Sequence, residues 1–318
     1  TRAAVRELSP GTDHFVDELE NDGVDLDKRI RIEVTAMVED SDIHFDLTGT
    51  SPQVRGPVNC VPSGSFAAAC YALRAVTDTS IPNNAGCFRS IRLTLPPDSL
   101  VNPTAPAPVN ARTATIKRIT GCMLGALAQA MPDRAIASNA GELVVMAFGG
   151  THNGETFVTG DLLAGGSGAG PDGDGVDAIE TDATNCMNVP AEAMELEAPI
   201  RVRRCALRRG TGGAGTTRGG LGLVKEFEVL ADDGVSFSHR GERHFSPAKG
   251  IDGGGDGGRA YSEIMRCDGT IEIIPSKIVT RLEKGDRVSV GTAGGAGRGD
   301  PGSRDPTAAH ADQANGKV

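Results

Sequence analysis

Two histidines in the last third of the chain are the residues best suited to proton transfer. His239 and His244 flank the charged stretch Arg240-Gly241-Glu242-Arg243, which directly follows the alternating Val235-Ser236-Phe237. Histidine titrates near neutral pH and can act as a general acid or base, and an arginine can hold a carboxylate through two parallel hydrogen bonds. The segment therefore indicates an acid/base or anion-binding loop. A salt-bridged surface turn is the alternative, and the residues alone leave both interpretations open.

A glycine run offers a second candidate. In Gly165-Gly166-Ser167-Gly168-Ala169-Gly170, successive backbone N–H groups could form an anion-binding concavity, with the Ser167 hydroxyl beside them. The spacing favours a plain flexible turn over such a site.

Two further glycine segments match the pattern G-x-G-x-x-G, at glycines 210, 212 and 215 and at glycines 253, 255 and 258. A dinucleotide loop requires a helix directly after its glycines, to place the pyrophosphate at the helix N-terminus. Here Thr216-Thr217-Arg218 and Arg259-Ala260-Tyr261 follow instead. Both segments are therefore predicted to be turns, and the chain has no P-loop signature.

Acidic residues cluster between the glycine segments, at Asp172, Asp174, Asp177, Glu180 and Asp182. The start of this run resembles a calcium loop, but Val176 stands where an oxygen ligand belongs and Asp177 where glycine is required. The run is predicted to be a solvated acidic loop, with a divalent-cation site as the alternative.

Composition limits the partners. The chain has 32 Lys and Arg against 42 Asp and Glu, a net charge of −10, which repels both a phosphate backbone and an anionic membrane. No apolar stretch is long enough to cross a bilayer, and the N-terminal residues show no signal pattern. The seven cysteines include no C-x-x-C pair, which argues against a disulfide framework and a structural zinc site. A soluble cytoplasmic protein that binds neither nucleic acid nor membrane is predicted.

The elements that must position these residues follow from hydrophobic periodicity. Residues 30–34 and 43–47 alternate as strands of a hairpin, and apolar runs at 143–148, 223–229 and 271–274 predict further strands. Helices are predicted over 65–77 and 115–131, the second ended by Pro132. The first thirty residues are predicted to be loop-like. The chain from Thr292 onward has little hydrophobicity, and residues 301–318 are predicted to form an extended or mobile tail.

The predicted fold is therefore α+β, a strand-rich mixed fold with a few helices and long glycine-rich loops. At 318 residues the chain could form one large domain or two moderate ones. No fixed-period repeat and no clear linker marks a boundary.

Several segments, in order and spacing, resemble the C-terminal portion of the hydantoinase B/oxoprolinase family. They cover nearly the whole chain, so residues 1–300 are identified as that portion. The matching segments are residues 45–59 (FDLTGTSPQVRGPVN), 81–89 (IPNNAGCFR), 124–130 (LGALAQA), 165–169 (GGSGA), 184–195 (TNCMNVPAEAME), 212–222 and 292–301.

The resemblance implies part of a B-type subunit of an ATP-dependent cyclic-amide hydrolase of the hydantoinase or 5-oxoprolinase type. A hydantoinase A-type ATPase subunit would bind ATP and Mg²⁺ and activate the small-molecule substrate, giving a hetero-oligomer. The family's divalent metal, Zn or Mn, belongs to the N-terminal half of the B-type subunit, which is absent from this sequence. Two alternatives stay open: a carboxylase subunit of the acetone or acetophenone type, and a non-catalytic scaffold of such a complex.

Polar residues set in family-like loops or at strand ends are the site candidates. The predicted catalytic residues are Asp46, His239 and His244. The predicted substrate-binding residues are Asn59, Ser167, Asn185, Asn188 and Arg240. None is predicted to bind a metal or a cofactor.

Overall fold

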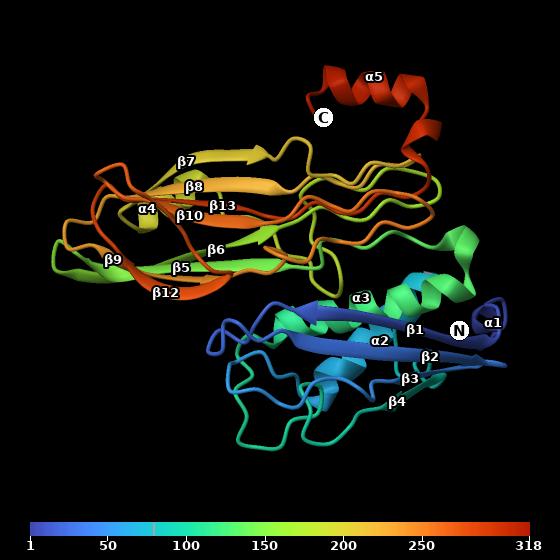
Figure 1. Cartoon of the computed structure of the whole chain (residues 1–318). Coiled ribbons are helices and arrows are strands. Elements are labelled where there is room, and N and C mark those ends of the chain that lie inside the picture. Colours follow the sequence, from blue (N-terminus) through green and yellow to red (C-terminus); the bar gives the residue numbers. More distant parts are fainter. Residues whose placement is uncertain (79) are drawn as a thin grey trace. The chain divides into compact units, whose positions relative to one another are not determined.

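The structure is a computed structural model that describes residues 1–78 and 80–318. It divides into two compact units (Figure 1). Unit 1 comprises Thr1–Ile136 and Asp182–Thr184, and unit 2 comprises Ala137–Thr181 and Asn185–Val318. Helices and strands occur together, which confirms the predicted α+β class.

Unit 1 contains one sheet, in the order β1-β2-β3-β4. Its strands are β1 (Gly11–Leu19), β2 (Ile30–Glu39), β3 (Asp42–Asp46) and β4 (Ile91–Thr94). The β1–β2 and β2–β3 pairs are antiparallel and β3–β4 is parallel. Strands β2 and β3 confirm the predicted hairpin, because their alternate apolar residues are buried, as period-two side-chain alternation requires.

Two long helices pack against this sheet and each other. They are α2 (Pro62–Val76) and α3 (Arg112–Ala130), and the smaller elements are α1 (Arg2–Val5) and the 3₁₀ turn η1 (Pro132–Arg134). Both predicted helices are confirmed. Ile119, Met123 and Leu127 of α3 are fully buried, and Pro132 ends the helix because proline cannot continue its hydrogen-bond ladder.

Strand β1 corrects the prediction of a loop-like N-terminal segment. It pairs with β2 along its whole length, from Gly11 to Leu19. Of its nine residues only Leu19 is fully buried, and Phe15 packs against the core from a half-buried position. Since an edge strand buries little apolar surface, its sequence lacks the alternation that marks β2.

Unit 2 is a sandwich of two sheets with a shared core (Figure 1). The rings of Phe148 and Phe227 come from opposite sheets with centroids 5.3 Å apart. One sheet orders β11 (Ile271–Ile273), β10 (Tyr261–Met265), β13 (Arg287–Gly291), β8 (Leu223–Val229) and β7 (Ile200–Leu207). The other orders β12 (Lys277–Leu282), β9 (Val235–Arg240), β5 (Leu143–His152) and β6 (Glu155–Ala164). Helix α4 (Ala191–Glu197) packs beside β7. The strands predicted at 143–148, 223–229 and 271–274 are confirmed.

The glycine-rich segments 165–176, 210–222, 250–258 and 292–299, here called the glycine lattice, run as extended chains outside any named strand. They bond to one another through backbone groups, for example Gly220 N–H to Ser167 O at 2.8 Å and Gly295 N–H to Gly220 O at 2.9 Å. A Cβ on Gly295 would lie 1.8 Å from Ser167 O, and one on Gly220 2.0 Å from Val176 O. Backbones this close leave no space for side chains, as in other packed extended chains with glycine at the contacts.

The lattice also explains both G-x-G-x-x-G matches. A Cβ on Gly212 would lie 2.0 Å from Gly219 O, and one on Gly258 would lie 2.9 Å from Thr211 Cα. Neither segment is followed by a helix, since β8 and β10 come next. Gly212 and Gly258 therefore serve chain packing, whereas Gly210 and Gly253 adopt the positive φ angles of turns, 68° and 90°. No helix N-terminus is placed to receive a pyrophosphate.

Residues 301–318, predicted to be an extended or mobile tail, contain the 3₁₀ turn η2 (Pro301–Ser303) and helix α5 (Pro306–Ala314). The Asp305 carboxylate caps α5 by accepting from Ala308 N–H, and Pro306 suits the first helical position. The sequence prediction rested on low hydrophobicity, but ion pairs rather than apolar burial attach this segment to unit 2.

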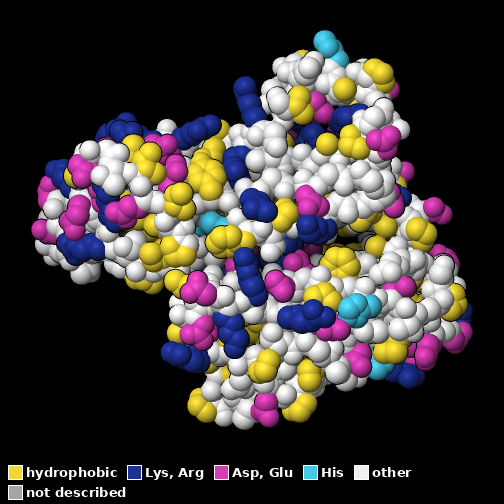
Figure 2. Space-filling view, viewed as in Figure 1, with side chains coloured by type: hydrophobic (Ala, Val, Ile, Leu, Met, Phe, Trp, Pro, Cys, Tyr) yellow, Lys and Arg dark blue, Asp and Glu magenta, His cyan; other side chains and the backbone are white. Residues whose placement is uncertain are grey.

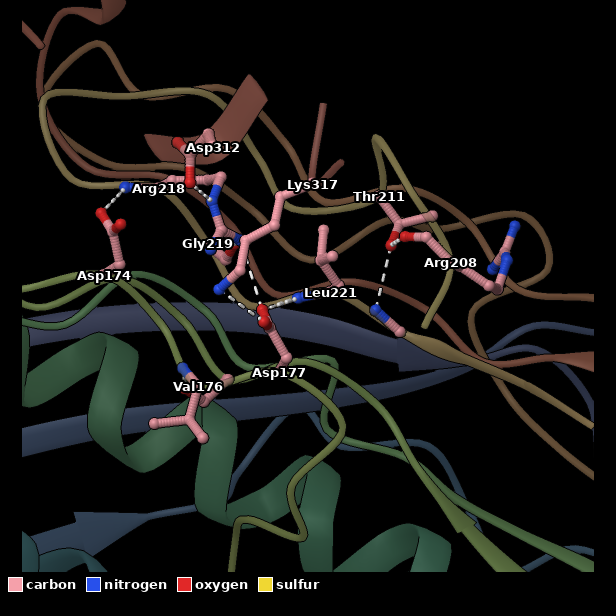
Figure 3. Close-up of polar contacts among 12 residues, drawn as sticks. Asp174, Val176, Asp177, Arg208, Thr211, Arg218, Gly219, Leu221, Asp312 and Lys317 are labelled. Carbon is pink, nitrogen blue, oxygen red and sulfur yellow. Dashed lines mark hydrogen bonds and ion pairs between the residues drawn. The ribbon is translucent and has the colours of Figure 1, made fainter. Parts of the chain in front are cut away.

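Those ion pairs use the acidic run. Arg304 binds Asp174 through two contacts of 2.9 and 2.7 Å, and Lys317 binds Asp177 at 2.8 Å. Arg218 lies between Asp177 and Asp312, at 3.4 Å from each (Figure 3). Burial alone would raise the pKa of Asp174, but the Arg304 guanidinium and the Arg218 N–H hold it below its ordinary value. Asp174 and Asp177 are thus bound by cations of the protein itself, which contradicts the cation-site alternative for these two residues. Residues 171–174 are nonetheless exposed, as the prediction of a solvated acidic loop expects.

Charges of both signs are interspersed on the face shown in Figure 2. None of the helices in the described part of the chain is both long and apolar enough to span a bilayer.

Candidate functional site

Both predicted catalytic histidines lie in one polar cluster at an end of the unit 2 sandwich. The histidine cluster, as we call it, comprises His239 at the end of β9, Ser262 on β10, Lys277 at the start of β12, and Glu242 and His244 on the loop after β9. The Ser262 Oγ lies 2.9 Å from His239 Nε2 and 3.1 Å from His244 Nε2. The Lys277 ammonium binds the Glu242 carboxylate and lies 3.4 Å from Gly241 O.

Hydrogen-bond chemistry fixes the direction of this chain of contacts when the His244 ring is neutral. The carbonyl oxygen of Glu242, 3.1 Å from His244 Nδ1, can only accept, so Nδ1 must carry the proton. His244 Nε2 then accepts from the Ser262 hydroxyl, whose oxygen accepts from His239 Nε2–H. His239 Nδ1 is left as a buried lone pair with no hydrogen-bond partner among the described residues.

Burial determines what each member can do. His239 and Ser262 are 0% and 1% exposed, and His244 is half-buried. Burial, together with the nearby His244 and Lys277, lowers the pKa of His239 to about 3. His239 therefore stays neutral at physiological pH and cannot donate a proton as an imidazolium. Of the two histidines, only His244 is exposed enough to meet a solute.

The depressed pKa of His239 predicts a pH-dependent stability. The unfolded histidine titrates near its ordinary pKa of 6.5, so between pH 6.5 and 3 the unfolded state binds more protons than the folded state. Stability is then lost as the pH falls through this window, by about 2 kcal/mol from pH 7 to pH 5. Urea unfolding of the wild type and of His239→Asn at pH 7 and pH 5 measures this loss of unfolding free energy. The variant should lose this part of the pH dependence. An equal change of the unfolding free energy in both proteins would rule the mechanism out.

Ser167 lies inside the glycine lattice, not at a binding surface. Its hydroxyl accepts from Val176 N–H at 2.7 Å. The N–H groups of residues 166–170 are bonded within the protein, including Gly168 N–H to the Asn139 side chain at 2.8 Å and Ala169 N–H to Ala296 O at 2.9 Å. This corrects both the anion-binding and the flexible-turn interpretations of the segment, because these five N–H groups are already used and the backbone is held on both sides.

Asp46 and Asn59 belong to unit 1, whereas the other six candidates belong to unit 2. Asp46 ends β3, half-buried, and accepts from Thr48 N–H at 2.8 Å. Asn59 is fully buried: its Oδ1 accepts from Val54 N–H at 2.8 Å, and its Nδ2 donates to carbonyls that include Pro108 O at 3.0 Å. The Asn59 amide thus closes its own loop, and any substrate contact would require breaking these bonds.

Asn185 and Asn188 are exposed on the loop before α4, and a buried ion pair holds this loop. The Lys225 ammonium on β8 binds the Asp161 carboxylate on β6 and also Val189 O at 3.0 Å. Asp161 in turn accepts from Val189 N–H at 2.9 Å. Both backbone groups of Val189 are therefore fixed from inside the sandwich, next to Asn188.

Sequence reasoning missed Ser262, Lys225 and Lys277. Two of them, Ser262 and Lys225, occupy inward positions of their strands: Ser262 lies two residues before the buried Ile264, and Lys225 two before the buried Phe227. A polar residue in phase with the apolar side of an alternating strand is the signal that could have found these two, because such a group requires an internal partner. Lys277 carries no such signal, because it is in phase with the exposed Val279 and Arg281 of β12. Arg240, predicted to bind substrate, is the last residue of β9 and is half-buried.

Comparison with known proteins decides the family. The sequence profile described as Hydantoinase B/oxoprolinase matches residues 1–301. The chain belongs to the hydantoinase B/oxoprolinase family. It is 34% identical over 330 residues to a putative B-type subunit of a D-/L-hydantoinase from Pseudomonas sp. (strain NS671), with 100% of this chain and 55% of the relative covered.

Two solved structures share the fold with a TM-score of 0.86 and cover 100% of this chain. One is nucleotide-free acetone carboxylase, 19% identical with 49% of its chain covered, and the other is ATP-dependent caprolactamase from Pseudomonas jessenii, 24% identical with 56% covered. This member of the hydantoinase B/oxoprolinase family therefore spans about half the length of these relatives.

The family's expected divalent metal does not fit the residues present. Across residues 1–78 and 80–318, no three His, Cys, Asp or Glu side chains converge as a metal site would require. Asp174 and Asp177 of the acidic run are bound by Arg218, Arg304 and Lys317, and Glu242 is bound by Lys277. No catalytic step through a metal is assigned to this chain.

Proposed function

We propose that this chain is part of the B-type subunit of an ATP-dependent cyclic-amide hydrolase of the hydantoinase or 5-oxoprolinase type. The observation that carries the proposal is the 34% identity to the B-type hydantoinase subunit along the whole chain. Sequence identity at this level over a full chain reflects more than a common fold, whereas the two solved structures are similar at 19% and 24% and support the fold alone.

The proposal includes partners. The chain spans 55% of the hydantoinase relative, and in this proposal further polypeptide supplies the rest of the B-type subunit. A hydantoinase A-type ATPase would bind ATP and Mg²⁺ and activate the substrate, and the remaining B-type segment would carry the divalent metal, Zn or Mn. No disulfide joins any of the cysteines in the described part of the chain, in keeping with a reducing compartment such as the cytoplasm.

In such a complex, this chain would contribute polar groups that bind and orient the substrate. Arg240 has no carboxylate partner in the described part of the chain, so its guanidinium can hold an anionic substrate group. The exposed amides of Asn185 and Asn188 can bond to the amide of a cyclic substrate, and Asp46 remains a candidate at the end of β3. His244 would accept or return a proton at Nε2 once the Ser262 hydroxyl turns away, while His239 and Ser262 hold its ring in place.

Carboxylation is the second candidate, because the family resemblance includes carboxylase subunits and the fold shared with both solved structures does not separate the two reactions. Both reactions use ATP to activate a poor electrophile or nucleophile, and they differ in the second substrate. A non-catalytic scaffold is the third possibility, since Ser167 and Asn59 are bound internally.

The reaction is tested on the complex that co-purifies with this chain. We expect ATP-dependent ring opening of 5-oxoproline, a hydantoin or caprolactam, followed by the appearance of the open-chain acid. ATP-dependent incorporation of labelled bicarbonate into acetone, without ring opening of any amide, would favour the carboxylase. A complex that keeps full activity when this chain is omitted would show a dispensable scaffold.

A further inference from the structure

Residues 81–89 (IPNNAGCFR), family-like in sequence, lie between α2 and β4 of unit 1. Together with Ser90 and the N-terminal segment they line a cavity of about 410 Å³. That volume is within the range of small-molecule pockets.

The backbone of this segment is held in a fixed shape. Asn84 Oδ1 accepts from Gly86 N–H at 2.8 Å, and Asn84 O accepts from Cys87 N–H at 3.0 Å. Ser90 O accepts from Ile43 N–H at 2.8 Å, which attaches the end of the segment to β3. The walls of the cavity are therefore formed before any ligand arrives.

Two cavity-lining groups are polar and unused. Ser90 is 1% exposed, and its Oγ has no hydrogen-bond partner among the described residues. A buried hydroxyl without a partner is costly, so a ligand acceptor at this position would be stabilising. The Arg89 guanidinium is exposed and makes no ion pair within residues 1–78 and 80–318.

The charges around the cavity favour an anion. Arg2, which also lines it, lies 3.3 Å from Asp42, and Asp42 is further held by Arg92 at 3.1 Å. Because Arg2 and Arg92 share this one carboxylate, Arg2 is only partly neutralised, and Arg89 adds a full positive charge. Ile81, Pro82 and the buried Cys87 add an apolar wall suited to an organic body.

We propose that this cavity binds a small organic monocarboxylate, with Arg89 pairing its carboxylate and the Ser90 hydroxyl donating to it. Only the choice of probe rests on the proposed function. 5-Oxoproline carries a carboxylate on a five-membered lactam, and 2-pyrrolidinone is the same ring without the carboxylate. The difference between their affinities therefore measures the contribution of the carboxylate.

Binding of both probes to this chain, without ATP or partner, is measured by calorimetry or NMR titration. We expect 5-oxoproline to bind at least about tenfold more tightly than 2-pyrrolidinone, the scale of one charge-assisted hydrogen bond. Arg89→Gln should abolish that preference and Ser90→Ala should weaken 5-oxoproline binding severalfold. Arg55→Gln, which changes an exposed arginine of unit 1 outside the cavity, should leave the affinity for 5-oxoproline unchanged.

Protection of Cys87 gives an independent readout. Because this thiol lines the cavity, 5-oxoproline should slow its alkylation by iodoacetamide, measured on the Cys87 peptide, while the exposed Cys205 reacts at an unchanged rate. Equal affinity for the two probes, unchanged affinity in Arg89→Gln, or tighter binding of inorganic phosphate than of 5-oxoproline would overturn the proposal. Ring opening by the complex with no binding here would reject this site and leave the proposed function standing.

Discussion

Replacing Gly295 by alanine is expected to lower the free energy of unfolding by at least about 3 kcal/mol, or to prevent soluble folding. The new Cβ would lie 1.8 Å from Ser167 O and 2.2 Å from Ser167 C. Both are backbone atoms of a neighbouring lattice chain, so no rotamer change can relieve the overlap. The two chains would have to separate, and the bonds from Gly295 N–H to Gly220 O and from Gly213 N–H to Gly295 O would weaken.

A matched control separates this effect from the loss of glycine as such. Gly173 belongs to the same lattice but is exposed, and a Cβ there meets no atom within 4 Å. Gly173→Ala should leave the urea midpoint nearly unchanged or raise it slightly, because alanine restricts the unfolded chain. Urea unfolding followed by circular dichroism compares both variants with the wild type. Similar midpoints for all three proteins would show that the lattice is not closely packed.

The second large effect concerns the ion pair of Lys225 and Asp161. Their side chains are 2% and 0% exposed, so Lys225→Met leaves a carboxylate buried without its cation, at a cost of about 3 to 5 kcal/mol. Adding Asp161→Asn removes the uncompensated charge, while an amide oxygen can still accept from Val189 N–H. The double variant should therefore recover part of the lost stability.

Lys284→Met is the control for this prediction. Lys284 pairs with Asp232 in the same unit, but the two side chains are 59% and 67% exposed, where ion pairs contribute little. Its effect on the unfolding free energy should stay below about 1 kcal/mol. If Lys225→Met were as mild as Lys284→Met, Val189 could not be anchored as described, and the placement of Asn188 would lose its support.

The sequence predicted the elements whose apolar residues repeat at a regular spacing. Helix α3 and strands β2 and β3 follow the stripe of Ile119, Met123 and Leu127 and the alternation of Ile30, Ile32 and Val34. It missed β1, because an edge strand buries little, and α5, because ion pairs rather than apolar contacts attach it. Hydrophobic periodicity could not predict the glycine lattice either. Its chains are held by close backbone contacts where side chains are absent, so they show no hydrophobic pattern.

The candidate site was predicted in part. His239 and His244 do lie together, because a charged stretch after an alternating strand must turn back near the strand end. Ser262, which connects them, lies 23 positions after His239 and 18 positions after His244, so a local sequence pattern cannot reveal the connection. Ser167 and Asn59 were chosen as polar residues in family-like loops, and the structure shows their side chains bonding within their own surroundings.

The most direct test of the central claim is the turnover of a cyclic amide by this chain with and without its partners. We propose that other polypeptide supplies the energy source and the metal. This chain alone should therefore open neither 5-oxoproline nor a hydantoin. Adding the ATPase subunit, the remaining B-type segment and ATP should produce the open-chain acid together with ADP. Ring opening by the isolated chain in the absence of ATP would contradict the account.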